Sequence, residues 1–361
     1  MNKTFENPGI YIHVPFCIKK CSYCNFFSIS EYKNYYTQYI KTLLNELKNI
    51  NDFFIKDIEP DTLYIGGGTP SLLELNDLEK ILKYLYAKYN FKEVTIEINP
   101  GTVDEETIKE YYNLGINRVS IGVQSLDDKV LNFLGRIHTE KKALNSISLV
   151  KKFFDNFSAD LIYAIPGFKG GILLKSMEKL TAFMTPHFST YSLSIEPGTL
   201  LDKKNVITND KQFQKEYKII HNYLSSKGFE HYEVSNFAMP GFESLHNNKY
   251  WIRSAYLGFG PCAHSLWNNK RFSYDKLNDF FDSALFDKYT NASVLTEDEI
   301  REEILMLGMR TNKGVSLSLI NINNSKLKKL KEEGFLIIKN NRLFPTLKGW
   351  TILNSLILEL L

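Results

Sequence analysis

Three cysteines in one short stretch are the strongest candidates for a reactive site. Cys17 and Cys21 are separated by three residues, and Cys21 and Cys24 by two. Thiolates are the usual protein ligands of iron–sulfur clusters, and three of them hold only three irons of a four-iron cluster. The fourth iron is then open to another ligand, so the spacing predicts a reactive centre.

A closed zinc site is the alternative, because structural zinc sites also use closely spaced cysteines. Its fourth ligand would be His13 or the distant Cys262. Disulfides are disfavoured, because four cysteines in 361 residues are sparse. The first residues show no apolar signal segment, so we expect the reducing environment of the cytoplasm. The cysteines alone leave the cluster and the zinc ion as alternatives.

Composition and length narrow the class of protein. The hydrophobic fraction of 43% is ordinary, and no stretch approaches the roughly 20 consecutive apolar residues of a membrane span. A net charge of +3 is too small to indicate a nucleic-acid partner. A chain of 361 residues exceeds one compact domain unless that domain is a barrel. The length therefore predicts a barrel with a smaller domain.

Strand-like apolar segments alternate with amphipathic helical stretches, which is typical of repeated βα units and a parallel sheet. Six strands are expected at residues 10–14, 62–66, 93–99, 118–124, 160–165 and 188–195. Helices are expected at 35–48, 75–89, 105–113, 141–154, 173–183 and 211–227. This order predicts an α/β fold with an open, partial (β/α)6 TIM-type barrel.

Polar residues recur on one side of these strands, which is unusual for a barrel core. Alternation places Ile10 and Ile12 opposite Tyr11 and His13, and it separates polar from apolar residues in the later strands as well. The later polar set consists of Glu97, Asn99, Ser120, Gln124, Asp160, Ser192 and Ser194. A buried polar group without a partner costs about 1 to 3 kcal/mol. A polar-lined interior therefore predicts bound ligands.

The carboxyl ends of barrel strands usually form the active site. The first strand leads into the cysteines, the second into Gly66–Pro70, the third ends at Glu97–Pro100, and the fourth ends at Gln124. The glycine triplet at 66–68 lets backbone groups approach a ligand closely. We therefore expect one site that joins these strand ends.

The chain resembles radical S-adenosylmethionine enzymes, and within them the branch of oxygen-independent coproporphyrinogen oxidases. The resemblance rests on the cysteine motif and on residues 11–17, 65–71, 118–125, 134–138, 160–167 and 195–199. It implies that Cys17, Cys21 and Cys24 hold a [4Fe-4S] cluster. It also implies that S-adenosylmethionine chelates the open iron through its amino and carboxylate groups.

The resemblance further implies a set of residues around S-adenosylmethionine. Tyr11, Gly67 and Glu97 match positions that contact the cofactor bound at the cluster. Further cofactor positions match Tyr23, Gly68, Thr69, Gln124, Arg136, Asp160 and Ser192, some of which serve a second S-adenosylmethionine in the oxidase. Structural alternatives are a surface ion pair for Arg136 and a local anchor for Asp160. No catalytic residue is assigned.

Two departures from the oxidase favour the HemW family of heme chaperones within this branch. Phe26 stands where the oxidase has another cysteine, and only ten residues precede Tyr11, where the oxidase has a long arm. The resemblance implies a protein that binds heme and delivers it to hemoproteins. Its expected partners are heme or another tetrapyrrole, acceptor hemoproteins including ones peripheral at a membrane, and a cytosolic electron donor, with no nucleic acid. The alternative is coproporphyrinogen oxidation in porphyrin biosynthesis, and cleavage of S-adenosylmethionine is left open.

The second half contains two candidate heme ligands. His246 begins His-Asn-Asn-Lys-Tyr-Trp, which matches an element of the chaperone branch, and His264 follows it. Histidine is a common axial ligand of heme iron, although a lone histidine is more often a hydrogen-bonded structural residue. We interpret Cys262 as a packing residue outside the cluster.

The pattern changes from residue 296 onward. Helices at 297–309, 326–333 and 347–360 surround a short hairpin, which predicts a winged-helix-like α+β domain over 296–361. The barrel with its extension is expected over 1–290, with a linker at 289–295. The family resemblance makes the C-terminal domain a cap on the barrel.

Overall fold

A large mixed sheet organises the chain. The structure is a computed structural model that describes residues 7–49, 59–282, 292–320 and 324–361. Its main sheet has the strand order β12-β11-β10-β9-β1-β2-β3-β4-β5-β6-β8-β7. The central strands are β1 (Gly9–Val14), β2 (Thr62–Gly67), β3 (Glu93–Ile98), β4 (Arg118–Gln124), β5 (Phe157–Tyr163) and β6 (His187–Ser192). Each is parallel to its neighbour. The six predicted strands are therefore confirmed.

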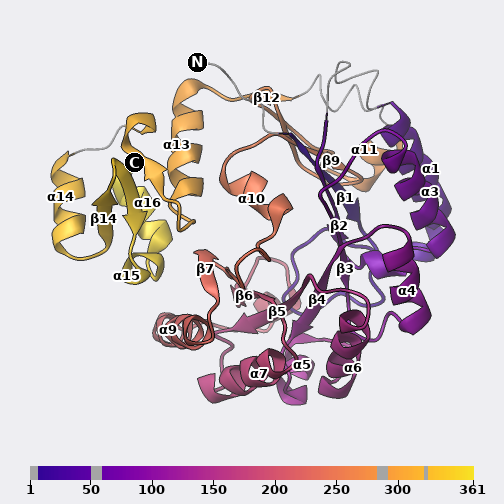
Figure 1. The fold of residues 1–361 in the computed structure, drawn as a ribbon, viewed down its shortest axis with the longest axis horizontal. Helices are drawn as coiled ribbons and strands as arrows, with labels where there is room; N and C mark the ends of the chain where they lie inside the picture. The colour runs from indigo at the N-terminus through magenta and orange to yellow at the C-terminus, as the bar shows by residue number, and fades with distance from the viewer. Residues whose placement is uncertain (1–6, 50–58, 283–291, 321–323) are drawn as a thin grey trace.

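Helices cover the outer face of these strands in an arc that runs from α1 to α9 (Figure 1). They are α1 (Tyr36–Lys48), α3 (Leu75–Tyr86), α4 (Glu105–Asn113), α5 (Asp128–Leu134), α6 (Glu140–Lys151), α7 (Gly170–Ala182) and α9 (Asp210–Ser226). In α3 the buried residues Leu78, Leu82 and Leu85 recur at helical spacing and face the core. Ile10 and Ile12 of β1 belong to the same core and are fully buried. The predicted α/β partial barrel is thus confirmed.

Some boundaries differ from the prediction. β5 ends at Tyr163 rather than at residue 165, because Ala164 has a left-handed backbone with φ +57°. The short helix α5 was not predicted. Shorter helical elements are α8 (Leu200–Lys203), α10 (Leu245–Trp251), α11 (Leu277–Asp282), η1 (Tyr32–Asn34) and η2 (Pro70–Leu72).

Both edges of the parallel sheet are extended by strands from the second half of the chain. At one edge, β9 (Tyr256–Phe259) is parallel to β1, and β10 (Ser265–Trp267), β11 (Lys270–Phe272) and β12 (Ser293–Val294) follow antiparallel. At the other edge lie β8 (Asn236–Ala238) and β7 (Glu230–Glu233). The linker predicted at 289–295 contains the two-residue strand β12, and residues 289–291 lie outside the described ranges. The domain boundary stays a prediction.

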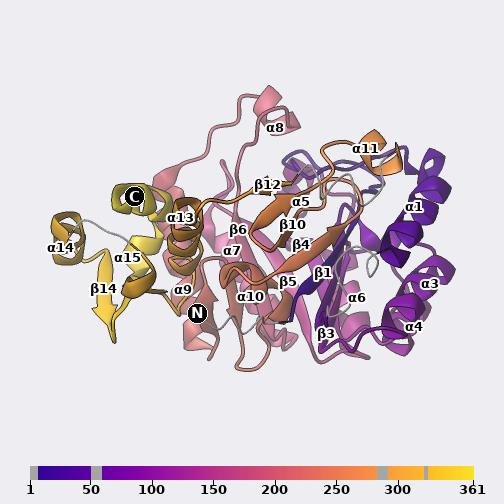
Figure 2. The ribbon, with the colours of Figure 1, turned by 90° about the horizontal axis from the view of Figure 1, so that it is seen from above.

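The C-terminal elements form a small α+β unit. They are α13 (Glu297–Gly308), β13 (Val315–Ser316), η3 (Leu317–Leu319), α14 (Asn324–Glu332), β14 (Leu336–Lys339), β15 (Arg342–Pro345), α15 (Leu347–Trp350) and α16 (Leu353–Leu360). The strands pair antiparallel in the order β13-β15-β14. The single helix predicted at 347–360 is instead two helices, α15 and α16. In both views this unit lies at the side of α9 and α10, opposite α1 and α3 (Figures 1 and 2).

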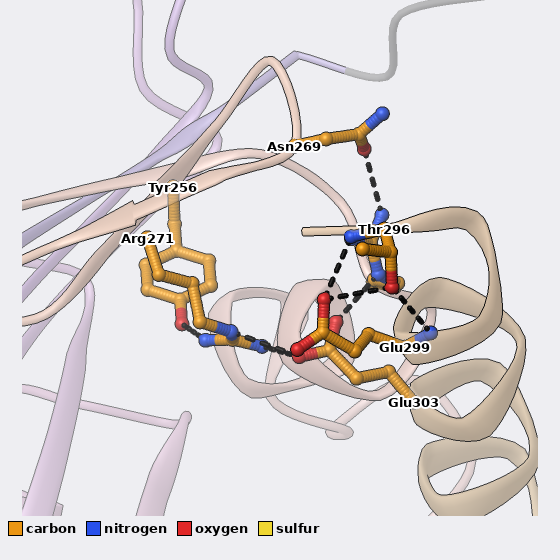
Figure 3. Close-up of polar contacts among 7 residues, drawn as sticks. Tyr256, Asn269, Arg271, Thr296, Glu299 and Glu303 are labelled. Carbon is orange, nitrogen blue, oxygen red and sulfur yellow. Dashed lines mark hydrogen bonds and ion pairs between the residues drawn. The ribbon is translucent and has the colours of Figure 1, made fainter. Parts of the chain in front are cut away.

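A polar junction joins this unit to the β9–β11 edge (Figure 3). Glu303 of α13 accepts from Arg253 Nε at 2.7 Å and pairs with Arg271 at 2.7 Å. Arg271 also donates to the Tyr256 hydroxyl at 3.1 Å. Thr296 begins α13 with a capping box to Glu299. These charges are mostly buried, so removing one partner leaves the others poorly compensated.

Membrane insertion was not expected from the hydropathy of the sequence. Within the described ranges, none of the helices combines the length and apolar character needed to cross a bilayer.

Candidate functional site at the carboxyl ends of the strands

The cysteine segment follows β1 and is tied down at several points. The Cys17 amide donates to the Ile29 carbonyl at 3.0 Å, and the Ser22 amide donates to Leu134 O at 2.9 Å, at the end of α5. Phe16 is fully buried among aromatic rings of the first helix region. The loop that carries the three thiols is therefore anchored by side-chain packing and backbone hydrogen bonds.

The glycine turn after β2 packs directly against this loop. A Cβ on Gly68 would lie 2.6 Å from Phe16 O and 3.0 Å from Cys17 Sγ, so only glycine fits there. Gly67 has φ +118° and donates its amide to Glu97 Oε2 at 3.1 Å. The predicted meeting of the first three strand ends is confirmed for the cysteine loop, the glycine turn and Glu97.

A network of polar side chains reaches the sulfur atoms. Arg136 donates to Cys21 Sγ at 3.4 Å, to Gly122 O at 2.8 Å, and to the Asn99 side chain. Asn99 donates to Thr69 Oγ1 at 2.8 Å, and Thr69 donates to Cys17 Sγ at 3.8 Å. These contacts place hydrogen-bond donors beside two of the three thiols, where they favour thiolate.

Burial and a nearby cation act in opposite directions on the ionisation of the thiols. Burial raises the pKa of the Cys17 and Cys24 thiols, so their ionised forms need nearby positive charge. Burial alone would lower the pKa of Arg136, but Tyr23 and Cys21 raise it above its usual value. Arg136 therefore stays charged beside Cys21. The surface-ion-pair alternative for Arg136 is wrong, because its guanidinium contacts the interior groups named above.

His13 does not have a nitrogen available for a metal. Its Nε2 donates to Phe27 O at 2.9 Å, so its Nδ1 accepts from the Tyr11 hydroxyl at 3.1 Å. The Sγ of Cys262 lies 3.5 Å from the Asp275 carbonyl. Both ring nitrogens of His13 are therefore engaged, and the Cys262 thiol is hydrogen-bonded within its own segment. Within the described residues, no three Cys, His, Asp or Glu side chains stand close enough to hold a single metal ion.

Two carboxylates line the interior next to this loop. Glu97 accepts from the Tyr64 hydroxyl at 2.7 Å, and Asp160 accepts from Ser120 Oγ at 3.2 Å. Burial raises the pKa of Glu97 to about 7 and that of Asp160 to about 6, against these hydrogen bonds and the charge of Arg118. Neither carboxylate forms an ion pair in the part of the chain that the structure describes. The interior is thus suited to a cationic ligand.

A small pocket opens at this end of the barrel. It is lined by Ile18, Lys19, Cys21, Thr69, Asn99, Thr102, Gly135, Arg136 and Ile137. The glycine turn, the cysteine loop and the end of α5 all contribute to its wall. Cys21 therefore lines an opening at the surface, together with Arg136 and Thr69.

Comparison with known proteins now identifies the family. The Radical SAM superfamily model matches residues 11–180, and the model of the HemN C-terminal domain matches residues 295–352. Heme chaperone HemW of Lactococcus lactis subsp. lactis (strain IL1403) is 34% identical over 316 residues, which cover 84% of this chain and 82% of that protein. The chain belongs to the HemW family. Heme chaperone HemW of Bacillus subtilis (strain 168) is 31% identical over 364 residues, covering 94% of this chain and 95% of the relative.

A solved structure supports the same architecture. Coproporphyrinogen III oxidase (HemN) from Escherichia coli matches 99% of this chain and 91% of its own, with a TM-score of 0.80 at 18% sequence identity. At 18% sequence identity, this similarity shows that the two proteins share a fold. The radical SAM family implies a [4Fe-4S] cluster and S-adenosylmethionine. This HemW family member has three partly buried thiols beside a charged guanidinium, and this donor set fits such a cluster.

The structure brings together most residues that the resemblance placed around S-adenosylmethionine. Tyr11 packs on Tyr64 at a ring distance of 6.0 Å, near Glu97. Tyr23 bonds to Arg136. Gln124 has a left-handed backbone with φ +62°, and its side chain lies against Gly122. A Cβ added to Gly122 would be 3.2 Å from Gln124 Nε2. These positions remain predictions for cofactor contacts.

The prediction that Ser192 faces the barrel interior is wrong. β6 pairs Ser189 with Asp160 and Ser192 with Tyr163, and paired residues of parallel strands point to the same face. Ser189 therefore shares the interior side with Asp160, to which it is hydrogen-bonded. The Ser192 hydroxyl contacts Tyr163, whose ring stacks on Phe213 of α9. Any cofactor contact of Ser192 would have to come from the end of the strand.

His246 lies at the opposite end of the barrel from the cysteines. It is 1% exposed, its Nδ1 contacts Thr62 Oγ1 at 2.9 Å, and its Nε2 contacts the Tyr250 hydroxyl at 2.8 Å. Its amide donates to Glu93 Oε1 at 2.9 Å. Thr62 and Glu93 begin β2 and β3. Both ring nitrogens are hydrogen-bonded within the chain and the ring is buried, so these contacts are those of a structural residue. Heme ligation by His246 stays a prediction.

Sequence reasoning missed several interior residues. Tyr64 lies two residues before Gly66 on the same strand face, so alternation signalled it. Arg118 is 1% exposed, and its Nε has no hydrogen-bond partner within the described residues. Its position two residues before Ser120 placed it in the interior, but a charged residue at a strand start is usually read as exposed.

Proposed function

We propose that this chain is a heme chaperone that binds heme and delivers it to acceptor hemoproteins. Similarity to proteins named heme chaperone HemW, at 34% identity over 84% of the chain, carries this proposal. The proposal includes a [4Fe-4S] cluster on Cys17, Cys21 and Cys24, with S-adenosylmethionine at the open iron. An electron donor and acceptor hemoproteins in the cytoplasm or at a membrane surface belong to the same proposal.

The residues of the site support these assignments. Arg136 and Thr69 donate toward Cys21 and Cys17, which stabilises thiolates and tunes the potential of a bound cluster. Glu97 and Asp160 supply negative charge for the ammonium and sulfonium of S-adenosylmethionine. The cluster, when bound, supplies one-electron reduction of the sulfonium. The anchored loop and the close Gly68 contact fix the thiols relative to the carboxylates.

Coproporphyrinogen oxidation is the alternative function. The solved oxidase shares the fold, as the TM-score of 0.80 shows. Phe26, at the position of the oxidase's additional cysteine, is 68% exposed and contributes no thiol. This difference favours the chaperone.

Two anaerobic incubations of reconstituted protein separate the functions. With heme, we expect about one heme per chain and transfer to an apo-hemoprotein. With coproporphyrinogen, S-adenosylmethionine and a reductant, we expect no loss of carboxyl groups. Decarboxylated product, or a failure to bind heme, would overturn the chaperone function. A Cys21→Ser variant serves as the cluster-deficient control in both incubations.

A further inference from the structure

A buried arginine without a counterion lies in the interior of the barrel. Arg118 is the first residue of β4 and is 1% exposed. Its Nε has no hydrogen-bond partner, and its guanidinium forms no ion pair within the ranges that the structure describes. Removing an uncompensated charge from water is costly. The presence of this charge therefore calls for an explanation other than packing.

Strand register places Arg118 beneath the two interior carboxylates. β3 pairs with β4 so that Thr95 lies beside Arg118. Two residues further on, Glu97 lies beside Ser120, so these four side chains share the interior face. Ser120 Oγ donates to Asp160 at 3.2 Å. Two residues span about 7 Å along a strand, so Arg118 lies one layer below both carboxylates, on the side away from the cysteines.

The charge of Arg118 acts on both carboxylates. Burial raises the pKa of Glu97 to about 7 and that of Asp160 to about 6, and the guanidinium acts against this effect. Two charges about 7 Å apart inside a protein change each other's pKa by on the order of one unit. Without the guanidinium, Glu97 would therefore be mostly protonated at neutral pH and would present no negative charge to a ligand.

The groups that lie near these carboxylates on other elements are mostly uncharged at neutral pH. His187 of β6 and His246 of α10 are neutral, because burial lowers their pKa. Arg136 acts on Asp160 from the side of the cysteines, and burial raises the pKa of Glu233 on β7 to about 7. Burial also raises the pKa of the nearby tyrosines, which are Tyr11, Tyr64, Tyr191, Tyr232 and Tyr250. The buried guanidinium of β4 is therefore the cation that acts from the amino side.

We infer that Arg118 is a positioning residue for the cationic cofactor, because its buried charge holds Glu97 and Asp160 in the ionised form that receives the ammonium and sulfonium of S-adenosylmethionine. This inference rests on the proposed cofactor site. A direct ion pair would occupy the carboxylate oxygens, whereas a charge one layer away leaves them free to accept from the ligand. A bound anion could also compensate the guanidinium, but two carboxylates above it disfavour one.

The pH dependence of cofactor binding tests this role. Anaerobically reconstituted protein is dialysed to equilibrium against S-adenosylmethionine between about pH 6 and about pH 9. Arg118→Gln should move the midpoint of the affinity profile up by about one pH unit, so affinity falls about fivefold at neutral pH and recovers by about pH 9. Arg118→Met should do the same, and Arg118→Lys, which keeps the charge, should retain the wild-type midpoint. Arg301→Gln, an exposed change on α13, is the matched control.

The outcomes separate the inference from the proposed function. If the wild type binds no S-adenosylmethionine at any pH, the proposed cofactor site fails and the role of Arg118 fails with it. If the wild type binds the cofactor and the uncharged variants lose affinity equally at every pH, the residue is merely structural and only the inference is overturned. An unchanged profile, or a midpoint in Arg118→Lys that moves as far as in Arg118→Gln, would overturn it as well. Melting curves and iron content verify that each variant is folded, and two uncharged replacements keep the test available if one is not.

Discussion

Replacing Glu97 by glutamine should stabilise the ligand-free protein above neutral pH and weaken its binding of S-adenosylmethionine. Burial raises the pKa of Glu97 from 4.5 to about 7. Each pKa unit corresponds to about 1.4 kcal/mol, and the carboxylate is partly open to the interior, so its ionisation costs on the order of 2 to 3 kcal/mol. Glutamine keeps both contacts, because its oxygen can accept from Gly67 N while its amide donates to the Tyr64 hydroxyl.

The sign of the pH dependence follows from the raised pKa. The protonated carboxyl is favoured in the folded state, so the wild type loses stability as pH rises from about 4.5 through 7. Glu97→Gln has no such loss. Thermal unfolding without ligand should therefore show little difference near pH 5 and a melting temperature roughly 4 °C higher for the variant at pH 8.5. Glu178→Gln, an exposed change on α7, is the control and should match the wild type at both pH values.

The affinity of Glu97→Gln for S-adenosylmethionine should fall, although its stability rises. A charge-assisted hydrogen bond to the ammonium or ribose contributes about 1.5 to 3 kcal/mol, so reconstituted Glu97→Gln should bind S-adenosylmethionine roughly 10- to 100-fold more weakly in equilibrium dialysis. Wild-type affinity should also fall as pH drops below about 7, because Glu97 becomes protonated. The reasoning is refuted if the variant is less stable at pH 8.5, or if it binds the cofactor as tightly as the wild type.

Three further substitutions test other contacts. Arg136→Gln removes the cation beside Cys21, so the cluster's reduction potential should fall by on the order of 60 mV in an electron paramagnetic resonance titration; an unchanged potential contradicts that role. His246→Ala should lower the free energy of unfolding by about 2 to 3 kcal/mol, because the Thr62 and Tyr250 hydroxyls lose their partner; stability equal to the wild type refutes the structural role. Glu303→Gln should speed proteolytic release of the C-terminal unit relative to the exposed control Asp298→Asn, and equal rates would argue against the junction.

Local patterns predicted the barrel strands well. The apolar residues of β1, β3 and β4 alternate with polar or small ones, so their interior faces could be assigned from the sequence. β6 has polar residues on both faces, with Ser189 on one and Ser192 on the other, so alternation could not choose between them. Its register is set by pairing with β5, which the sequence of β6 does not contain.

Contacts between distant segments limited the site prediction most. Glu93 accepts hydrogen bonds from residues about 150 positions away at the start of α10, and these contacts place His246 at the amino ends of the strands. The pairing of β9 with β1 brings His264 to the carboxyl ends. The periodicity of residues within α10 or β9 does not predict either of these long-range contacts. The motif around His246 therefore suggested a ligand, whereas its long-range contacts indicate a structural role.

Iron and acid-labile sulfide analysis of anaerobically purified and reconstituted protein tests whether Cys17, Cys21 and Cys24 hold a four-iron cluster with one open iron. We expect about four irons and four sulfides per chain, lost when any one of these cysteines is replaced by serine and retained in Cys262→Ser. A tightly bound zinc ion, or protein that acquires no iron and sulfide on reconstitution, would contradict the account.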